Sequence, residues 1–158
     1  VFLNRNHSYS RFLDTFPQLK KRNIDVVVHL IVGIPGENRK LMLETIKEMN
    51  RLKPAGIKFH LMHVLKDTPL DRIYKKKQFK TLSQEEYTGI MVDLLEHLDP
   101  DIVIHRITGE REQELFVAPL WALDKIKTIN AIRSRMIDRN SFQGIKIDQI
   151  QDLKRENL

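Results

Sequence analysis

The chain has 158 residues, which is enough for about one domain with a single hydrophobic core. Hydrophobic residues make up 41% and charged residues 30%, as is ordinary for a globular protein. The absence of cysteine excludes disulfides, thiolate zinc sites and an iron–sulfur ligand set within this chain, and it fits a reducing, cytoplasmic compartment. The net charge of +6 permits an anionic partner such as RNA without requiring one. We expect no membrane contact, because no apolar run approaches the roughly 20 residues that span a bilayer.

The chain begins with "VFLNRN", which lacks methionine and carries no secretory signal pattern. We interpret this start as a cut through a larger domain, with a processed terminus as the alternative. Ser8 can cap a helix, and we expect Pro17 to kink or interrupt it. The apolar residues of this helix are Tyr9, Phe12, Leu13, Phe16 and Leu19.

Three segments have the composition of strands that are buried on both faces, and a helical pattern follows each. The strands are expected at 24–32, 57–65 and 101–108. The first helix carries an apolar stripe through Met42, Ile46 and Met49 and ends at Pro54. The second helix begins with the capping-box pattern Ser83-Gln-Glu-Glu86. Its amphipathic face comprises Tyr87, Ile90, Met91, Leu94, Leu95 and Leu98.

The last helix is expected at 121–139, and the polar tail from about residue 140 is either a short added helix or partly disordered. The expected buried stripe of this helix comprises Leu123, Ile126, Ile129, Ile132 and Met136. Strand followed by helix, three times over, predicts an α/β fold with a parallel sheet and right-handed crossovers. Ligands of such sheets lie at the carboxyl ends of the strands, which selects the loops 33–38, 66–82 and 109–121.

The first of these loops contains the turn Gly33-Ile-Pro-Gly36-Glu37. Glycine at a strand end lets the backbone approach a planar ligand closely. The turn lacks the lysine of a phosphate-binding loop and the spacing of a dinucleotide fingerprint. The alternative is a tight strand-to-helix turn in which the charge of Glu37 lies favourably near a helix N-terminus.

Four histidines, His29, His60, His63 and His105, lie within the expected strands. A histidine in an apolar strand is most often a satisfied core residue. A metal site of histidines alone is disfavoured, because His60 and His63 face opposite sides of a strand. His105 and Arg106, followed by Arg111, place charge at the end of the third strand, where they form either an ion pair at the sheet rim or a contact to an anionic substrate.

Basic residues are clustered in two further segments. Each cluster either is exposed to solvent or binds a phosphate backbone. No interleaved aromatic residues suggest base stacking. The long loop carries Lys75, Lys76, Lys77 and Lys80, and the last helix carries Lys125, Lys127, Arg133, Arg135 and Arg139.

The stretches "HLIVGIPGE", "GIKFHLMHVLKDTPL", "LSQEEY", "DIVIHRITGE" and "APLWALDKIKTINAIRSRM" together resemble the carboxyl-terminal half of a bacterial radical S-adenosylmethionine protein family. This family is the YhcC/YtqA-type group, related to the radical domain of the Elongator catalytic subunit. The resemblance covers residues 3–136 and implies half of a partial (βα)6 barrel. Members of the family bind S-adenosylmethionine on a [4Fe–4S] cluster and cleave it to a 5′-deoxyadenosyl radical.

The resemblance also implies roles for particular residues. The fifth-strand motif of the family matches His29, Ile31 and Gly33, with His29 in place of the usual glycine and Ile31 near the adenine ring. The turn residues Pro35, Gly36 and Glu37 belong to the same implied cofactor site. The backbone near His63 and Val64 is expected at the adenine edge. Arg5 matches an arginine that can hold the cofactor carboxylate, and His105, Arg106 and Arg111 are expected to contact substrate.

The chain departs from the family pattern in one decisive respect, because the three-cysteine loop that holds the cluster is absent. We therefore expect this chain alone to be unable to assemble the cluster or make the radical, and we assign it no metal ligand. Kinship with Elongator and the basic charge suggest tRNA as the substrate of the whole protein. The alternative is a non-redox α/β module that binds a small ligand or RNA, while acid–base barrel chemistry has no paired residues to support it.

Two expectations concern organisation. Residues 1–139 are expected to form the carboxyl-terminal half of the barrel domain with its extension, and residues 140–158 the polar tail. A half-barrel leaves a sheet edge unpaired, and an unpaired edge is a template for association. We therefore expect self-association through the first strand or the N-terminal helix.

Overall fold

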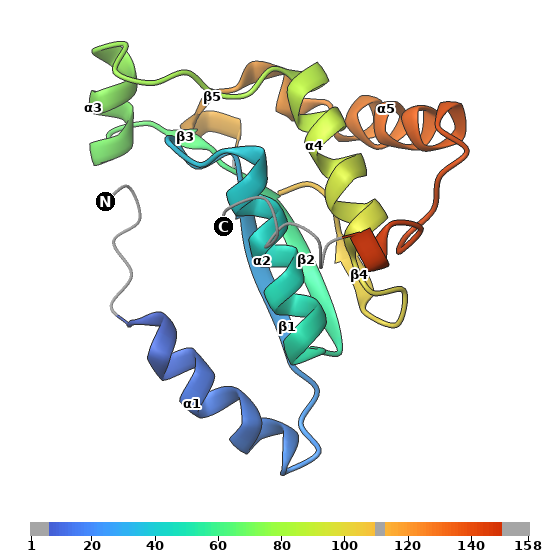
Figure 1. Ribbon diagram of the computed structural model, residues 1–158. Coiled ribbons are helices and arrows are strands. Elements are labelled where there is room, and N and C mark those ends of the chain that lie inside the picture. Colours follow the sequence, from blue (N-terminus) through green and yellow to red (C-terminus); the bar gives the residue numbers. More distant parts are fainter. Residues whose placement is uncertain (1–6, 110–112, 150–158) are drawn as a thin grey trace, which may run out of the picture.

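The computed structural model describes residues 7–109 and 113–149, and a three-stranded parallel sheet lies at its centre (Figure 1). The strand order is β1-β2-β4, and a helix follows each strand. The strands are β1 (Val27–Val32), β2 (Gly56–Leu61) and β4 (Val103–Arg106), and the helices that follow them are α2 (Arg39–Leu52), α4 (Gln84–His97) and α5 (Lys125–Asp138). The predicted α/β fold with a parallel sheet is confirmed.

A second, two-stranded sheet was not predicted. It pairs β3 (Val64–Leu65) with β5 (Phe116–Ala118) in antiparallel orientation. The predicted single strand over 57–65 is therefore wrong, because the chain leaves the main sheet after Met62, whose N–H still donates to the Val32 carbonyl at 2.8 Å. The third strand is also shorter than the predicted 101–108. The remaining elements are α1 (Tyr9–Lys20), α3 (Pro69–Lys75) and two 3-10 turns, Gln113–Leu115 and Leu120–Leu123.

The hydrophobic core lies between one face of the main sheet and the helices α2 and α4. The predicted stripe of α2 is confirmed, since Met42, Ile46 and Met49 are all buried. The sheet contributes residues at every second position, as the pleat requires. These residues are Val28, Leu30 and Val32 from β1, Ile57, Phe59 and Leu61 from β2, and Ile104 from β4.

Helix α4 begins with the predicted capping box. The Ser83 Oγ accepts a hydrogen bond from the Glu86 N–H at 3.2 Å, and the Glu86 carboxylate accepts one from the Ser83 N–H at 2.7 Å. Tyr87 and Met91 are fully buried, so the expected apolar face of this helix is the one that enters the core.

Two helical expectations were wrong. Helix α1 continues through Pro17 as far as Lys20, so Pro17 does not interrupt it, although the proline ring removes one backbone N–H donor from the helix. In the last helix, the expected stripe fails at Ile126, which is 74% exposed. A 3-10 turn occupies 120–123, and Asp124 caps a new helix, so that Thr128 and Ile132 are the buried residues of α5.

The tail over 140–149 forms turns that pack against the end of α4. The Gly144 N–H donates to the Leu95 carbonyl at 3.0 Å, and the Lys146 N–H donates to the Glu96 carbonyl at 2.7 Å. Among the helices that the structure describes, none combines the length and apolar character needed to cross a membrane.

Candidate functional site

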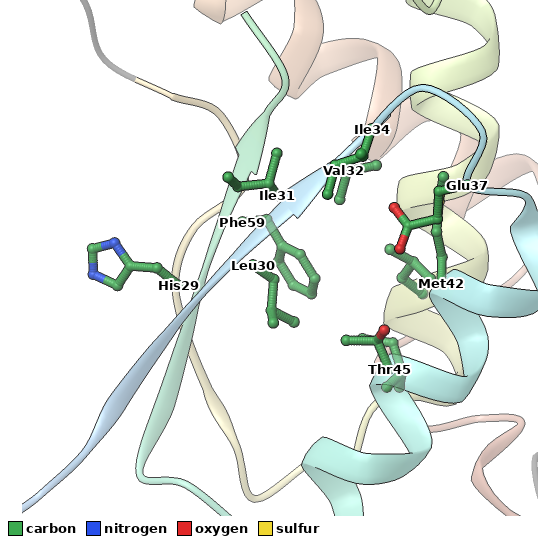
Figure 2. A pocket seen from close by; sticks show the side chains of 11 residues that line it. His29, Leu30, Ile31, Val32, Ile34, Glu37, Met42, Thr45 and Phe59 are labelled. Atoms are coloured by element: carbon green, nitrogen blue, oxygen red, sulfur yellow. The ribbon is translucent and has the colours of Figure 1, made fainter. Parts of the chain in front are cut away.

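The face of the main sheet opposite to α2 and α4 carries the candidate site. Residues of β1 and β2 alternate between the two faces, so the residues between the core positions point to the opposite side. His29 points away from Leu30 and Phe59 in Figure 2, on the far side of β1 from α2. We call this side the open face; its members are His29, Ile31, Lys58, His60, His105 and Arg106.

A β-bulge places two consecutive residues of β4 on the open face. Ile57 pairs with Ile104, but Lys58 pairs with Arg106, so one extra residue stands on β4 between these pairs. Residues directly opposite one another share a face, which puts Arg106 beside Lys58. His105 lies over Gly56, where an added Cβ atom would be only 2.5 Å from the His105 ring. The bulge thus turns two basic side chains toward the same side.

The imidazole rings of His29 and His60 stack across the neighbouring strands. Their centroids are 5.1 Å apart and their planes differ by 22°. The Nε2 atom of His60 is inaccessible to solvent and has no hydrogen-bond partner among the described residues. Burial, followed by the nearby positive groups His29, Arg106 and Lys58, lowers the pKa of His60 below its usual value.

The open face contains several residues that were predicted from the sequence to belong to the site, and two that were not. His29 and Ile31, expected near the cofactor, lie on the same face as His105 and Arg106, expected near the substrate. Lys58 and His60 were not selected as site residues. Strand alternation alone was the signal that could have found them, since both share the parity of His29 and Ile31 in the register of the two strands.

The turn after β1 requires glycine for its backbone conformation and, at one position, for close packing. Gly33 and Gly36 both have positive φ angles, +90° and +86°. A Cβ atom at Gly33 would lie 2.8 Å from the Leu82 Cδ1 atom, whereas nothing lies within 4 Å of one at Gly36. The close approach that Gly33 permits in this structure is therefore that of Leu82. The Glu37 N–H closes the turn by donating to the Ile34 carbonyl at 3.0 Å, across Pro35.

Glu37 lies on the helix side of β1, whereas His29 lies on the open face (Figure 2). Its carboxyl group lines a cavity of about 180 Å³ together with Met42 and Thr45. The Oε2 atom is buried without a hydrogen-bond partner in the described chain, and burial raises the pKa of Glu37. Asn38, rather than Glu37, caps α2, by accepting a hydrogen bond from the Leu41 N–H at 2.9 Å.

His63 and Val64 lie beyond the end of β2, away from the stacked histidines. The His63 ring meets the Phe116 ring edge-on, with centroids 5.3 Å apart. Val64 is fully buried, and its backbone pairs with Ala118 of β5. The close contact between His63 and Gly109 joins this segment to the chain that follows β4. Arg5 and Arg111 lie outside the described residues.

Several of the basic residues that could hold a phosphate backbone are paired with carboxylates instead. Lys75 bonds to the buried Asp71 at 2.7 Å, and Arg135 bonds to Glu85. Arg139 reaches Asp93 at 2.8 Å. The Lys75–Asp71 pair lies within α3, and the other two join the end of α5 to α4, which favours a structural role for these charges. No group of three or more His, Asp or Glu side chains in the described ranges is arranged to hold a metal ion.

Comparison with protein families gives one match that covers more than half of the chain. Residues 54–138 match the Radical_SAM C-terminal domain. The uncharacterized protein YtqA of Bacillus subtilis is 36% identical over 152 residues, which is 96% of this chain and 47% of that protein. Protein YhcC of Escherichia coli K12 is 29% identical over 142 residues, or 90% of this chain and 46% of that protein. The chain thus spans slightly less than half the length of these relatives.

A solved structure has a similar fold. The archaeal Methanocaldococcus infernus Elp3 with an N-terminal deletion superposes with a TM-score of 0.73 at 18% sequence identity. The match covers 89% of this chain and 33% of the Elp3 chain. At this sequence identity the match supports similarity of the fold alone. The similarity extends over nearly all of the chain.

Proposed function

Because the chain belongs to the Radical_SAM C-terminal domain family, we propose that it forms the carboxyl-terminal half of a partial (βα)6 barrel in a radical S-adenosylmethionine enzyme. The parallel order β1-β2-β4, with a helix after each strand, supports this architecture. The open face then corresponds to the interior of the barrel, and the ends of β1 and β2 to the rim where barrel enzymes bind ligands. The family match is the observation that carries the proposal.

The residues present fit the adenine half of the cofactor. Ile31 is 38% exposed on the open face and offers an apolar surface beside the stacked rings of His29 and His60. An adenine ring stacks on such a surface without requiring a charged partner. We therefore assign Ile31 and His29 to the ring, with the backbone of Gly33 at the same strand end.

The same chain does not fit the [4Fe–4S] cluster. Such clusters are held by cysteine thiolates, and the 158 residues contain none. The cluster ligands of the whole protein must therefore come from outside this sequence, and this chain alone is expected to be inactive. Incubation with ferrous iron and sulfide should leave it without the absorbance of a bound cluster, and a bound cluster would contradict the assignment.

Binding of S-adenosylmethionine tests the assignment directly. We expect the methyl resonances of Ile31 to shift on titration with S-adenosylmethionine, and those of Leu41, which is 51% exposed on α2, to stay in place. The variant Ile31→Asp should abolish the shifts of neighbouring residues, whereas Leu41→Asp should retain them. The absence of binding at millimolar cofactor, or equal binding by both variants, would overturn the assignment.

The substrate that we propose for the whole protein is tRNA. The net charge of +6 supports this choice, together with the resemblance of the sequence motifs to the Elongator-related family. A gel shift with tRNA at two salt concentrations tests it, because contacts to phosphates weaken steeply as salt rises. Binding that is absent or independent of salt would count against tRNA.

A second candidate function for this chain is ligand or RNA binding without redox chemistry. The absence of cysteine together with the basic open face favours it. Joining this chain to a cluster-binding segment separates the two candidates, since only the first predicts that the joined protein cleaves S-adenosylmethionine.

A further inference from the structure

The segment 66–80, which we call the basic arm, carries most of the positive charge of the chain. It contains α3, which Figure 1 shows at the margin of the molecule, away from the central sheet. Six basic residues stand against two acidic ones, so the arm has a net charge of +4 out of +6 for the whole chain. The basic residues are Lys66, Arg72, Lys75, Lys76, Lys77 and Lys80. The electrostatic complement of the basic arm is therefore an anionic partner.

Three of these charges are available to a partner. Asp71 is 1% exposed, and its carboxylate accepts a hydrogen bond from the Lys75 ammonium group at 2.7 Å. Arg72, Lys76 and Lys77 are exposed, and they form no ion pair with the residues that the structure describes. The one buried carboxylate of α3 is thus engaged by Lys75, and the three exposed cations keep their charge for an external group.

The backbone of the basic arm is held in place at its start. The Lys66 N–H donates to the Leu115 carbonyl at 2.7 Å, which ties the arm to the segment before β5. The Thr68 Oγ1 atom caps α3 by accepting a hydrogen bond from the Asp71 N–H at 3.2 Å. A backbone that is already ordered lowers the entropic cost of binding through its side chains.

Lys77 occupies a position at which glycine is the favoured residue. It follows the last turn of α3 with a φ angle of +55°. Its N–H donates to the Tyr74 carbonyl at 2.8 Å, and the Gln78 N–H donates to the Ile73 carbonyl at 3.3 Å. This pattern is the Schellman motif, in which the left-handed residue is usually glycine because a side chain there is strained.

The strain at Lys77 is not offset by an ion pair. Lys53, at the end of α2, also has a positive φ angle, but its ammonium group pairs with Asp99 at 3.6 Å. Lys77 has no carboxylate partner among the described residues. A strained residue that gains no such contact within the chain points to a function for its side chain.

The surroundings of these cations favour RNA phosphates over a lipid surface or nucleic-acid bases. A helix that binds a membrane inserts exposed apolar side chains. None of the exposed large hydrophobic residues belongs to the basic arm, all of whose residues the structure describes. The Tyr74 and Phe79 rings pack against each other, with centroids 5.5 Å apart, so they are not arranged to stack between bases.

We infer that the basic arm binds the phosphate backbone of RNA through Arg72, Lys76 and Lys77, without reading the base sequence. The inference rests on the RNA partner proposed above and requires no radical chemistry. The arm follows β2 and β3 in the chain, on the side of the carboxyl ends of the strands, where barrel enzymes bind their ligands. RNA held by the arm therefore approaches the same rim as the proposed cofactor site.

The test is fluorescence anisotropy of the 158-residue chain with a labelled tRNA transcript and a labelled RNA hairpin of unrelated sequence, each at several salt concentrations. We expect log K to fall linearly with log salt. Lys76→Gln/Lys77→Gln should lower this slope by about two and weaken both RNAs alike, because each lysine releases roughly one counterion. Lys77→Gly should weaken binding while it raises the unfolding midpoint, a combination that loss of a structural contact would not produce.

A matched variant separates the arm from general charge. Lys21→Gln/Arg22→Gln removes two neighbouring exposed charges after α1, far from α3 in Figure 1. This control should change the slope by less than about 0.5, since charges more than roughly 10 Å away are largely screened at about 0.1 M salt.

The outcomes distinguish the arm from the proposed tRNA partner. Undiminished binding by Lys76→Gln/Lys77→Gln, or an equal loss in the two double variants, would overturn the inference and leave the tRNA proposal standing. Equal affinity for both RNAs, lost in Lys76→Gln/Lys77→Gln, would support the arm and count against tRNA as the specific partner. Absence of RNA binding would overturn the inference, and binding to phosphatidylserine vesicles in its place would identify a membrane surface as the partner.

Discussion

His29 and His60 stack with ring centroids 5.1 Å apart, although 30 residues of sequence separate them. The parallel register of β1 and β2 creates this pair, because Ile31 lies opposite His60 and His29 lies one pair further down the same face. Two imidazoles at this distance cannot both take a proton without mutual repulsion. Burial, followed by the neighbouring His29, lowers the pKa of His60.

The pKa of His60 should be measurably low, and it should rise when His29 is replaced. Burial is the largest cause of the lowered pKa and the charge of His29 is the next, so His29→Gln is expected to raise the pKa of His60. Because the folded pKa lies below the unfolded one, the neutral form stabilises the fold above the unfolded pKa, and this contribution is lost as the pH falls through the folded pKa. An NMR titration of the ring protons measures the shift, with His7 as the exposed comparison, and an unchanged pKa in His29→Gln would contradict the pairing.

Replacement of Glu37 should stabilise the protein at neutral pH. Its buried Oε2 atom lacks a partner, and burial raises the pKa of the group, so the folded chain favours the protonated form. The stability advantage of that form is fully present below the unfolded pKa and is lost as the pH rises through the folded pKa. Glu37→Gln should therefore raise the free energy of unfolding at pH 7 relative to wild type, and this gain should vanish near pH 4.

Urea denaturation at both pH values measures this effect. Glu44→Gln is the matched control, because Glu44 lines the groove next to α2 beside Glu37 but has no buried, unpartnered oxygen in the described structure. Equal gains in the two variants would show that a general change of charge, and not the buried carboxyl group, is responsible.

The two glycines of the β1–α2 turn should differ in their tolerance of alanine. Both have positive φ, so either substitution should cost about 1–2 kcal/mol of stability in backbone strain. Gly33→Ala additionally brings its Cβ atom 2.8 Å from Leu82, and it should be the more destabilising variant. Chemical denaturation of Gly33→Ala, Gly36→Ala, Leu82→Ala and the double variant Gly33→Ala/Leu82→Ala measures the difference. A double variant that recovers none of the extra loss would show that Leu82 is not the cause.

The contact between α4 and the tail should depend on Glu96. Its side chain is 1% exposed and accepts hydrogen bonds from Lys146 at 2.5 Å and Ser141 at 2.8 Å. Burial opposes ionisation, yet Lys146, Ser141 and Arg139 together hold the pKa of Glu96 below its usual value. The resulting stabilisation is present above the unfolded pKa and is lost as the pH falls through the folded one.

Lys146→Met should therefore destabilise the fold by about 1–3 kcal/mol, because it leaves a buried carboxylate short of a partner. Arg51→Met is the matched control, since the pair of Arg51 with Glu48 is largely exposed and should be worth at most about 1 kcal/mol. Thermal or urea unfolding compares the two variants, and equal losses would mean that the tail contributes nothing through Glu96.

The sequence predicted the elements whose signals are local. The Met42, Ile46 and Met49 stripe and the Ser83–Glu86 capping box each lie within one helix, and both are confirmed. Such features are recoverable because periodicity and caps depend only on near neighbours in the chain.

The features that the sequence could not predict depend on distant residues. The bulge that turns Arg106 beside Lys58 arises from the pairing of two strands about 48 residues apart, and no residue type marks it. Leu82 packs against Gly33, which lies 49 residues earlier in the chain, and no local pattern predicts this contact. The exposed Ile126 was placed in the core because the 3-10 turn before α5 changed the phase of the helix. Which side chains lie together on the open face therefore depends on the strand register more than on any local sequence motif.

We expect the free edge of β1 to be the contact through which the chain self-associates. Among the described strands only β2 pairs with β1, and a groove of about 800 Å³ runs beside β1, between α1 and α2. Val26 lines this groove together with Phe12 and Leu41. An unpaired edge with an apolar border favours addition of a strand from a second copy. We expect the chain to form dimers or larger species at micromolar concentration in sedimentation velocity.

Val26→Lys should shift this equilibrium toward the monomer, because a lysine at the border opposes pairing at the edge. Ile137→Lys is the matched control, since Ile137 is an apolar residue that is 77% exposed on α5, away from β1. A chain that sediments as a clean monomer, or one whose association Ile137→Lys weakens as much as Val26→Lys does, would show that β1 is not the contact. Association that survives both variants would place the contact on another surface of the chain.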